Sequence, residues 1–172
     1  MAKKTRTRKP TIPIVVEEKK INVLYVDDEI DNLNAFKAVF RRDFEVFIAE
    51  SANEGMKIIE NKENDIHIVL TDQRMPNITG VEFLASLVKD FPQIMRVLVT
   101  GYADLATVID AINKGEVYRY VSKPWDNVEL KNLILQAFEV YDLRKRNKKL
   151  TDDLLRVNSQ IEFMLRQRLS SE

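Results

Sequence analysis

Acidic, basic and hydroxyl side chains stand where several apolar segments of this 172-residue chain end. Asp27 and Asp28 follow one such segment, and Asp72 follows another. Thr100 closes a further segment, and Lys123 comes after the last of them. Carboxylates held together repel one another unless a cation neutralises them. Carboxylate oxygens are ligands that Mg²⁺ prefers, so these residues indicate a site for a hard divalent cation.

The same residues suggest phosphoryl chemistry. A carboxylate beside a divalent cation can attack phosphorus and form an aspartyl phosphate. The cation and a nearby ammonium group would neutralise the phosphoryl oxygens as charge moves. Lys123 would supply that ammonium group, and the Thr100 hydroxyl would donate a hydrogen bond to the product. An acidic rim exposed to solvent is the structural alternative, and the complete set of residues argues against it.

The composition excludes much of ordinary enzymology. The chain has no cysteine and one histidine, His67. It therefore has no disulfide framework, no thiolate nucleophile and no zinc site built from cysteine. We interpret His67 as a structural residue inside the third apolar segment rather than as a phosphoryl acceptor. The reactive groups that the composition still offers are carboxylates, lysines and hydroxyls.

Five apolar segments rich in β-branched residues alternate with helical patterns. The expected strands are 21–26, 44–49, 66–71, 95–100 and 117–122, and the expected helices are 29–42, 51–63, 79–90, 103–114 and one that begins near 126. Nearly continuous apolar strands are typical of sheets covered on both faces. Five strands, each followed by a helix, predict an α/β fold with a five-stranded, parallel, doubly wound sheet. The residues described above would then converge at its carboxyl edge.

Capping residues and the absence of helix-breaking residues indicate where the helices begin and how the chain divides into segments. Ser51 and Glu54 have the spacing of a capping box, and Asp104 is expected to cap the fourth helix. The last helix contains no Pro or Gly as far as about residue 169, which gives a rod of roughly 65 Å. Such a rod must project from a domain of this size. We therefore predict segments at 1–20 (flexible basic tail), 21–139 (domain), 140–169 (projecting helix) and 170–172 (tail).

Charge is balanced overall but unevenly distributed. Residues 1–20 hold seven basic and two acidic side chains, residues 21–138 hold twelve and nineteen, and residues 139–172 hold eight and six. An acidic body argues against a globular nucleic-acid binder. No apolar run approaches the roughly 18 residues that a membrane span needs. The basic N-terminal segment is not followed by the apolar stretch of a secretory signal, so we predict a cytoplasmic protein without a membrane partner.

Apolar residues recur along one face of the projecting helix. In a heptad register, the a positions are Val140, Asn147, Leu154 and Ile161, and the d positions are Leu143, Leu150, Val157 and Met164. This spacing predicts a coiled coil. A buried Asn at an a position pairs best with its twin in a parallel dimer, so Asn147 favours a parallel homodimer. A single amphipathic helix that folds back or frays is the alternative.

The motifs at the strand ends resemble the receiver domain of bacterial two-component response regulators. The resemblance rests on the segments Val26-Asp27-Asp28-Glu29, Thr71-Asp72-Gln73-Arg74-Met75-Pro76, Thr100-Gly101-Tyr102 and 118–125. These motifs occur in the family's order and cover roughly residues 21–141. The resemblance implies a flavodoxin-like receiver fold. It also implies that a histidine kinase, or a phosphotransfer protein, donates a phosphoryl group to Asp72.

The resemblance further implies a Mg²⁺ site. Asp27, Asp28 and Asp72 would hold the cation, with Asp28 the more direct ligand of the acidic pair. The backbone carbonyl of Arg74, two residues beyond Asp72, would be another ligand.

The remaining motif residues are assigned by the same resemblance. Lys123 would pair with the phosphoryl group, and the Lys123–Pro124 bond is expected to be cis. Thr100 would be the switch hydroxyl and Tyr120 the switch aromatic. From its position after Lys123-Pro124, we expect Trp125 to pack at the start of the last helix.

The predicted function is a phosphorylation-controlled switch that relays its state through its dimeric stalk or a downstream output protein. One alternative is a receiver and linker from a longer regulator whose output domain is missing. Another, from a different class, is a Mg²⁺-dependent phosphohydrolase with an Asp nucleophile. That hydrolase needs an Asp-x-Asp spacing after its first strand, whereas Asp27 and Asp28 are adjacent. We therefore expect no enzymatic activity beyond assisting the chain's own phosphotransfer and dephosphorylation.

Overall fold

The computed structural model describes residues 20–101 and 105–170. Strands and helices alternate along the chain from β1 to α5. The elements are β1 (Asn22–Val26), α1 (Ile30–Phe40), β2 (Glu45–Ala49), α2 (Ala52–Glu60), the short 3₁₀ helix η1 (Lys62–Asn64), β3 (Ile68–Asp72), α3 (Gly80–Asp90), β4 (Met95–Thr100), α4 (Leu105–Asn113), β5 (Arg119–Ser122) and α5 (Asn127–Leu169). The tail predicted over residues 1–20 lies, except for residue 20, outside the described residues, as do Tyr102 and the cap predicted at Asp104.

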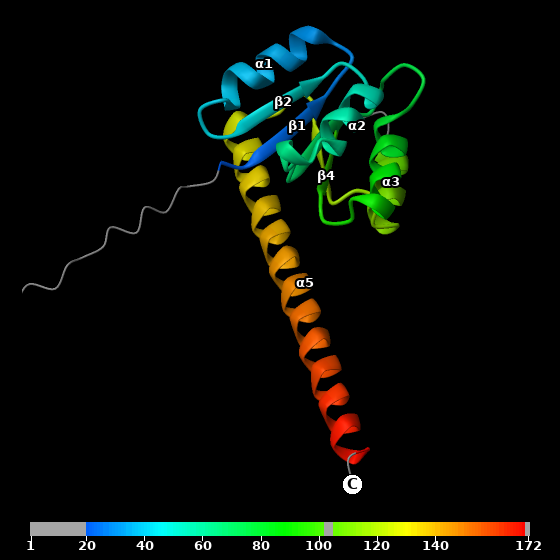
Figure 1. The fold of residues 1–172 in the computed structure, drawn as a ribbon. Helices are drawn as coiled ribbons and strands as arrows, with labels where there is room; N and C mark the ends of the chain where they lie inside the picture. The colour runs from blue at the N-terminus through cyan, green and yellow to red at the C-terminus, as the bar shows by residue number, and fades with distance from the viewer. Residues whose placement is uncertain (1–19, 102–104, 171–172) are drawn as a thin grey trace, which may run out of the picture.

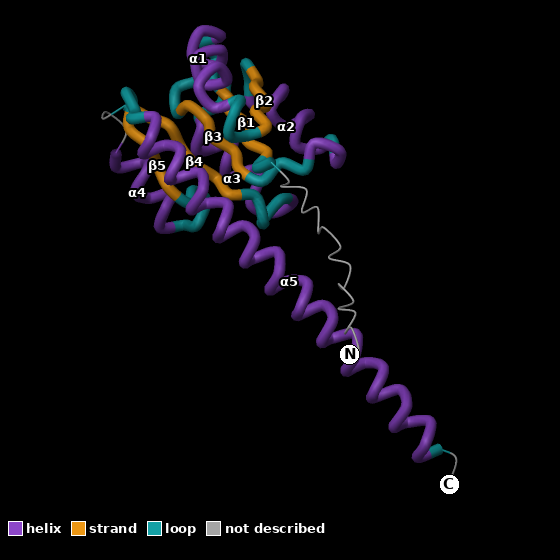
Figure 2. The backbone as a smooth tube through the Cα atoms, turned by 90° about the vertical axis from the view of Figure 1, so that its left-hand side faces the viewer, coloured by secondary structure: helices purple, strands orange, loops and turns teal. Residues whose placement is uncertain are grey.

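The strands form one parallel sheet in the order β2-β1-β3-β4-β5. Figure 2 shows them side by side in this order, with helices on both faces. The central strands β1, β3 and β4 are almost wholly buried because a helical layer covers each face. The predicted five-stranded, doubly wound α/β fold is confirmed.

Alternate residues of each strand supply two separate cores. One core packs the sheet against α1 and α5, and Tyr25, Phe36 and Ile134 belong to it. The other packs the opposite face against α2, α3 and α4, and Leu24 and Leu84 belong to it. The period of two that a strand imposes on its side chains therefore decides which helices each residue meets.

Helix α5 belongs to the domain at its start and leaves it at its end. Asp126 caps the helix by accepting hydrogen bonds from the amides of Val128 and Glu129 at 2.8 and 3.0 Å. The first four turns pack on the sheet as far as the buried Tyr141. Beyond that residue Arg144 still contacts Met95 Sδ at 3.7 Å, and the helix then continues as an exposed rod, shown from orange to red in Figure 1. No helix within residues 20–101 and 105–170 is long and apolar enough to cross a membrane.

Several details differ from the sequence prediction. His67 precedes β3 rather than lying within the strand, and its Nδ1 accepts a hydrogen bond from the Asn22 amide at 3.0 Å. Half of the predicted capping box forms, because the Glu54 amide donates to Ser51 while the Glu54 carboxylate turns back to the Glu50 amide. A complete capping box instead opens α3, at Thr79 and Glu82. These differences reflect local hydrogen bonds that compete with the simplest pattern.

Candidate functional site

The fold brings three of the predicted site residues together at the carboxyl edge of the sheet. Asp27 follows β1, Asp72 ends β3, and Lys123 follows β5. The Lys123 Nζ lies 2.6 Å from Asp72 Oδ1 and 3.0 Å from Asp27 Oδ2. The Lys123–Pro124 peptide bond is cis, as predicted. One ammonium group therefore bridges two carboxylates that would otherwise repel each other.

Asp72 is held on both of its carboxylate oxygens. Oδ1 accepts from Lys123, and Oδ2 accepts a hydrogen bond from the Arg74 amide at 2.7 Å. The side chain is close to solvent, since the residue is 8% exposed at the end of its strand. A carboxylate in this position is fixed in direction and can still be reached by an incoming group.

Asp27 is more deeply buried and more heavily hydrogen-bonded than Asp72. The residue is 1% exposed. Its Oδ1 accepts from the Glu29 amide at 2.9 Å, and its Oδ2 accepts from the Tyr25 hydroxyl at 2.6 Å and from Lys123 at 3.0 Å. The Asn32 side-chain amide lies 3.2 Å from both oxygens. This carboxylate is thus surrounded by donors.

These contacts determine the charge states at the site. Burial by itself would raise the pKa of Asp27, but the hydrogen bonds it accepts, first that from Tyr25, outweigh burial and lower its pKa. Burial would lower the pKa of Lys123, but its contacts with Asp72 and Asp27 raise it. Burial, followed by the bond to Asp27, raises the pKa of Tyr25 strongly. At neutral pH the site therefore holds an anionic Asp27, a cationic Lys123 and a neutral Tyr25.

Asp28 contrasts with its neighbour. Its side chain is exposed, and among the described residues it has no hydrogen-bond or ion-pair partner. The described residues contain no group of three or more His, Asp or Glu side chains already gathered around one point. The donor types nevertheless fit Mg²⁺, because Asp27 and Asp28 follow β1 and Asp72 ends β3, which puts three carboxylate-bearing residues at the same edge of the sheet. Lys123 supplies a neutralising charge to Asp27 and Asp72.

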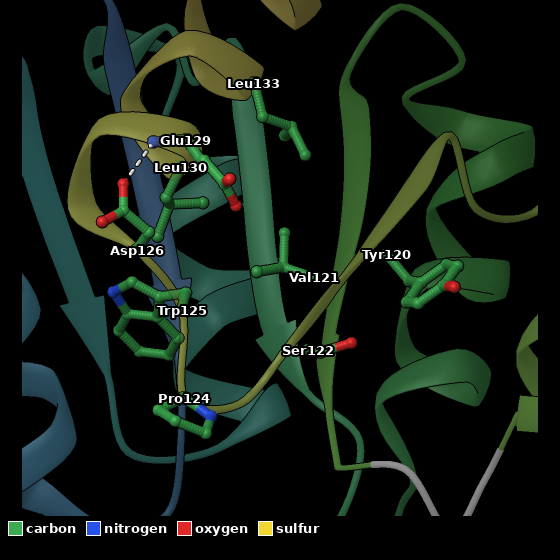
Figure 3. Close-up of a pocket in the computed structure, with 9 residues that line it drawn as sticks. All are labelled: Tyr120, Val121, Ser122, Pro124, Trp125, Asp126, Glu129, Leu130 and Leu133. Atoms are coloured by element: carbon green, nitrogen blue, oxygen red, sulfur yellow. Dashed lines mark hydrogen bonds between the residues drawn. The ribbon is translucent and has the colours of Figure 1, made fainter.

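The two predicted switch residues lie on neighbouring strands. Thr100, buried at the end of β4, donates its hydroxyl hydrogen to the Gly101 carbonyl at 3.0 Å rather than to Asp72. Tyr120 is 39% exposed on β5. Figure 3 shows its ring on the opposite side of the strand from Val121, at the margin of a pocket of about 430 Å³. This pocket is bounded by β5, by Trp125 in the following loop and by the first turns of α5, including Leu130.

Gly80 fixes the start of α3 against the end of β3. A Cβ atom at this position would overlap the carbonyl oxygen of Asp72 and lie 2.8 Å from Leu98 Cδ1. The Gly80 amide also donates to the Gln73 carbonyl at 3.0 Å. The close approach of helix and strand therefore requires a residue without a side chain.

We predict that Gly80→Ala lowers the free energy of unfolding by about 2–3 kcal/mol, the usual cost of overpacking a tight site. Chemical denaturation followed by circular dichroism measures the change. Gly101→Ala is the matched control, because a Cβ there would meet nothing within 4 Å. Equal stability of the two variants would contradict the prediction.

Comparisons with known proteins agree with this geometry. The family model for the response regulator receiver domain matches residues 23–135. The chain belongs to this family. A solved response regulator receiver domain protein from Clostridium thermocellum superposes on it with a TM-score of 0.68 at 31% identity, covering 72% of this chain and 98% of the other. A structure titled adenylate cyclase from Rhodopirellula baltica gives 0.73 at 31% identity, covering 76% and 96%.

Curated relatives of this receiver domain are regulatory proteins. The hydrogenase transcriptional regulatory protein HoxA of Bradyrhizobium diazoefficiens is 34% identical over 123 residues, which cover 72% of this chain and 25% of HoxA. The photosynthetic apparatus regulatory protein RegA of Rhodobacter capsulatus is 31% identical over 123 residues, covering 69% of this chain and 63% of RegA. The receiver chain thus spans about a quarter of the length of HoxA.

Sequence reasoning missed two donors to Asp27. Tyr25 lies in the apolar run of β1, so the pattern marks it only as a core residue. Asn32 lies in the first turns of α1, where a polar residue is normal. The spacing of Tyr25 two residues before Asp27 was the available signal, since alternate strand residues lie on one face. Trp125 packs at the start of α5 as predicted, with its ring edge against Tyr25 and Phe36.

Proposed function

We propose that Asp72 accepts a phosphoryl group from a histidine kinase or a phosphotransfer protein, and that the receiver domain acts as a phosphorylation-controlled switch. The observation that supports it best is the Lys123 ammonium, which lies 2.6 Å from Asp72 Oδ1 and 3.0 Å from Asp27 Oδ2. The carboxylate that must attack phosphorus therefore lies beside the cation that neutralises the phosphoryl oxygens.

The transfer step follows from these groups. An oxygen of Asp72 forms a bond to phosphorus while the bond from phosphorus to the donor's histidine nitrogen breaks, and its electron pair stays on that nitrogen. Mg²⁺ held by Asp27, Asp28, Asp72 and the backbone carbonyl of Arg74 would add positive charge at the transferring oxygens. Lys123 does the same from the protein side, and the Arg74 amide keeps the Asp72 carboxylate oriented.

The switch would run through Thr100 and Tyr120. A phosphoryl group adds about −1.5 to −2 charges at Asp72. That charge offers the Thr100 hydroxyl a stronger acceptor than the Gly101 carbonyl it now contacts. Tyr120 can then turn inward from its exposed position on β5. The change would reach α5, whose first turns pack beside β5.

We further propose that the rod of α5 pairs with a second copy of the chain as a parallel coiled coil. Val140 is partly buried against the receiver's own core, so the intermolecular seam would begin at Leu143. Its other members are exposed along the rod. They are Asn147, Leu150, Leu154, Val157, Ile161 and Met164. We expect the dimer to act in the cytoplasm and to report to a downstream output protein.

The proposal is tested by incubating the chain with acetyl phosphate and Mg²⁺. We expect one phosphoryl group per chain by intact-mass analysis, stable in acid and labile in base, as an acyl phosphate is. Continuous release of inorganic phosphate over many turnovers, at a rate typical of enzymes, would instead indicate a phosphohydrolase. A chain that takes up no phosphoryl group would contradict the proposal.

A further inference from the structure

Tyr25 is a buried hydroxyl group aimed at the phosphorylation site from the core. The residue is completely buried in β1, and its hydroxyl lies 2.6 Å from Asp27 Oδ2. The ring packs against Phe36 with centroids 4.7 Å apart and meets the edge of Trp125 at 6.1 Å. Packing on both sides therefore fixes the direction in which the hydroxyl points.

Tyr25 and Lys123 donate to the same oxygen. Asp27 Oδ2 accepts from the Tyr25 hydroxyl at 2.6 Å and from Lys123 Nζ at 3.0 Å. Asp27 is almost inaccessible to water, so a donor lost from this oxygen is not replaced by solvent without cost. Lys123, however, is also needed by Asp72, which it contacts at 2.6 Å. The two carboxylates compete for one ammonium group.

Phosphorylation of Asp72 would draw the Lys123 ammonium toward Asp72 and away from Asp27. A phosphoryl group on Asp72 concentrates negative charge on its side of Lys123, so the ammonium moves away from Asp27. Tyr25 cannot follow, since its ring is packed in β1 two residues before Asp27. Its hydroxyl would then be the donor that remains closest to Oδ2, with Asn32 at 3.2 Å as a weaker one.

We infer that Tyr25 is a positioning residue. Its hydroxyl keeps its hydrogen bond to Asp27 when Lys123 moves away, so that Lys123 can pair with the phosphoryl group. The inference rests on the proposed function of Asp72. It assigns to a core residue of β1 a part in phosphotransfer that its apolar surroundings do not suggest.

The test is Tyr25→Phe, which removes one oxygen and keeps the packed ring. At saturating Mg²⁺, the rate of phosphorylation by acetyl phosphate should fall about tenfold, the scale of one hydrogen bond to a charged group. The Mg²⁺ concentration for half-saturation should change less than the rate does, because Tyr25 donates to Asp27 and not to Asp28, the more direct ligand of the acidic pair. Affinity for beryllium trifluoride, a phosphoryl mimic, should fall with the rate. Trp125, the single tryptophan, reports both binding events by fluorescence without any turnover.

Tyr141→Phe is the matched control. Tyr141 is also buried, but it lies in α5, and its hydroxyl accepts a long 3.5 Å contact from Lys145 far from the site. Parental rates in Tyr25→Phe, or an equal loss in both variants, would overturn the inference. A raised Mg²⁺ requirement with an unchanged saturating rate would also overturn it, because Tyr25 would then act on the metal alone. A parent chain that takes up no phosphoryl group overturns the proposed function as well.

A second variant covers the case in which Tyr25→Phe does not fold. Asn32→Ala removes another donor to Asp27 from a partly exposed position in α1, where alanine is a good helix former. A smaller loss in the saturating phosphorylation rate, again without a change in Mg²⁺ requirement, supports the inference. A loss of more than about tenfold in Asn32→Ala would overturn it, because Asn32 rather than Tyr25 would then hold Asp27.

Discussion

Asp72→Asn is expected to abolish phosphoryl uptake while leaving the fold intact. The amide lacks the anionic oxygen that attacks phosphorus, so no acyl phosphate forms. Stability should change by less than about 1 kcal/mol, because Lys123 keeps its 3.0 Å contact with Asp27 when Asp72 loses its charge. Intact-mass analysis after incubation with acetyl phosphate and Mg²⁺ measures uptake, and thermal unfolding checks the fold.

Asp90→Asn provides the control for this experiment. Asp90 is the last residue of the 11-residue helix α3, whose first residue lies beside Asp72, and it is exposed. The control should be phosphorylated at the parental rate. Full labelling of Asp72→Asn would show that another residue accepts the phosphoryl group, and it would invalidate the proposed chemistry.

The second large effect is expected on dimerisation, which should depend on one of two adjacent leucines in the rod of α5. Leu154 and Leu155 are 64% and 61% exposed in the single chain, but only Leu154 lies in the proposed seam. Leu154→Asp should therefore convert a dimer into a monomer at micromolar concentration. Burying a leucine is worth about 1.5–3 kcal/mol per chain, and a buried pair of like charges adds to that loss. Sedimentation of the full chain measures the change.

Leu155→Asp is the matched control and should remain dimeric. Truncation after Tyr141 should also give a monomer, because it removes the whole exposed part of the seam. A parent chain that sediments as a monomer, with or without beryllium trifluoride, would contradict the coiled-coil proposal. Dissociation by both leucine variants would place the contact on a broader face of the rod than the seam.

The alternation of apolar segments with helical patterns predicted the sheet, and the sheet accounts for the meeting of Asp27, Asp72 and Lys123. Parallel strands bring their carboxyl ends to one edge whatever the loops between them do. The start of α5 was equally predictable, since Asp126 has the usual chemistry of a helix cap. These features depend on local pattern and topology, which a single sequence contains.

Other features depend on distances between elements, which no periodicity specifies. The direction of the Tyr25 hydroxyl is fixed by packing of the ring against Phe36 and Trp125, which are far apart in sequence. The partial burial of Val140 depends on how far the domain extends along α5, and the heptad pattern continues through that boundary without a break. The Glu54 carboxylate accepts a hydrogen bond from the Glu50 amide instead of completing the capping box with the Ser51 amide. Only the local backbone geometry decides between these two bonds.

The unbroken course of α5 makes it a lever. Its root is clamped in the sheet core up to Tyr141, and the 43-residue helix contains no Pro or Gly at which to bend. The part beyond the domain is about 40 Å long at 1.5 Å per residue. A tilt of about 5° at the root would therefore sweep the tip through about 3.5 Å at this length. Met164, about 34 Å beyond Tyr141 at 1.5 Å per residue, would move by about 3 Å in the same tilt.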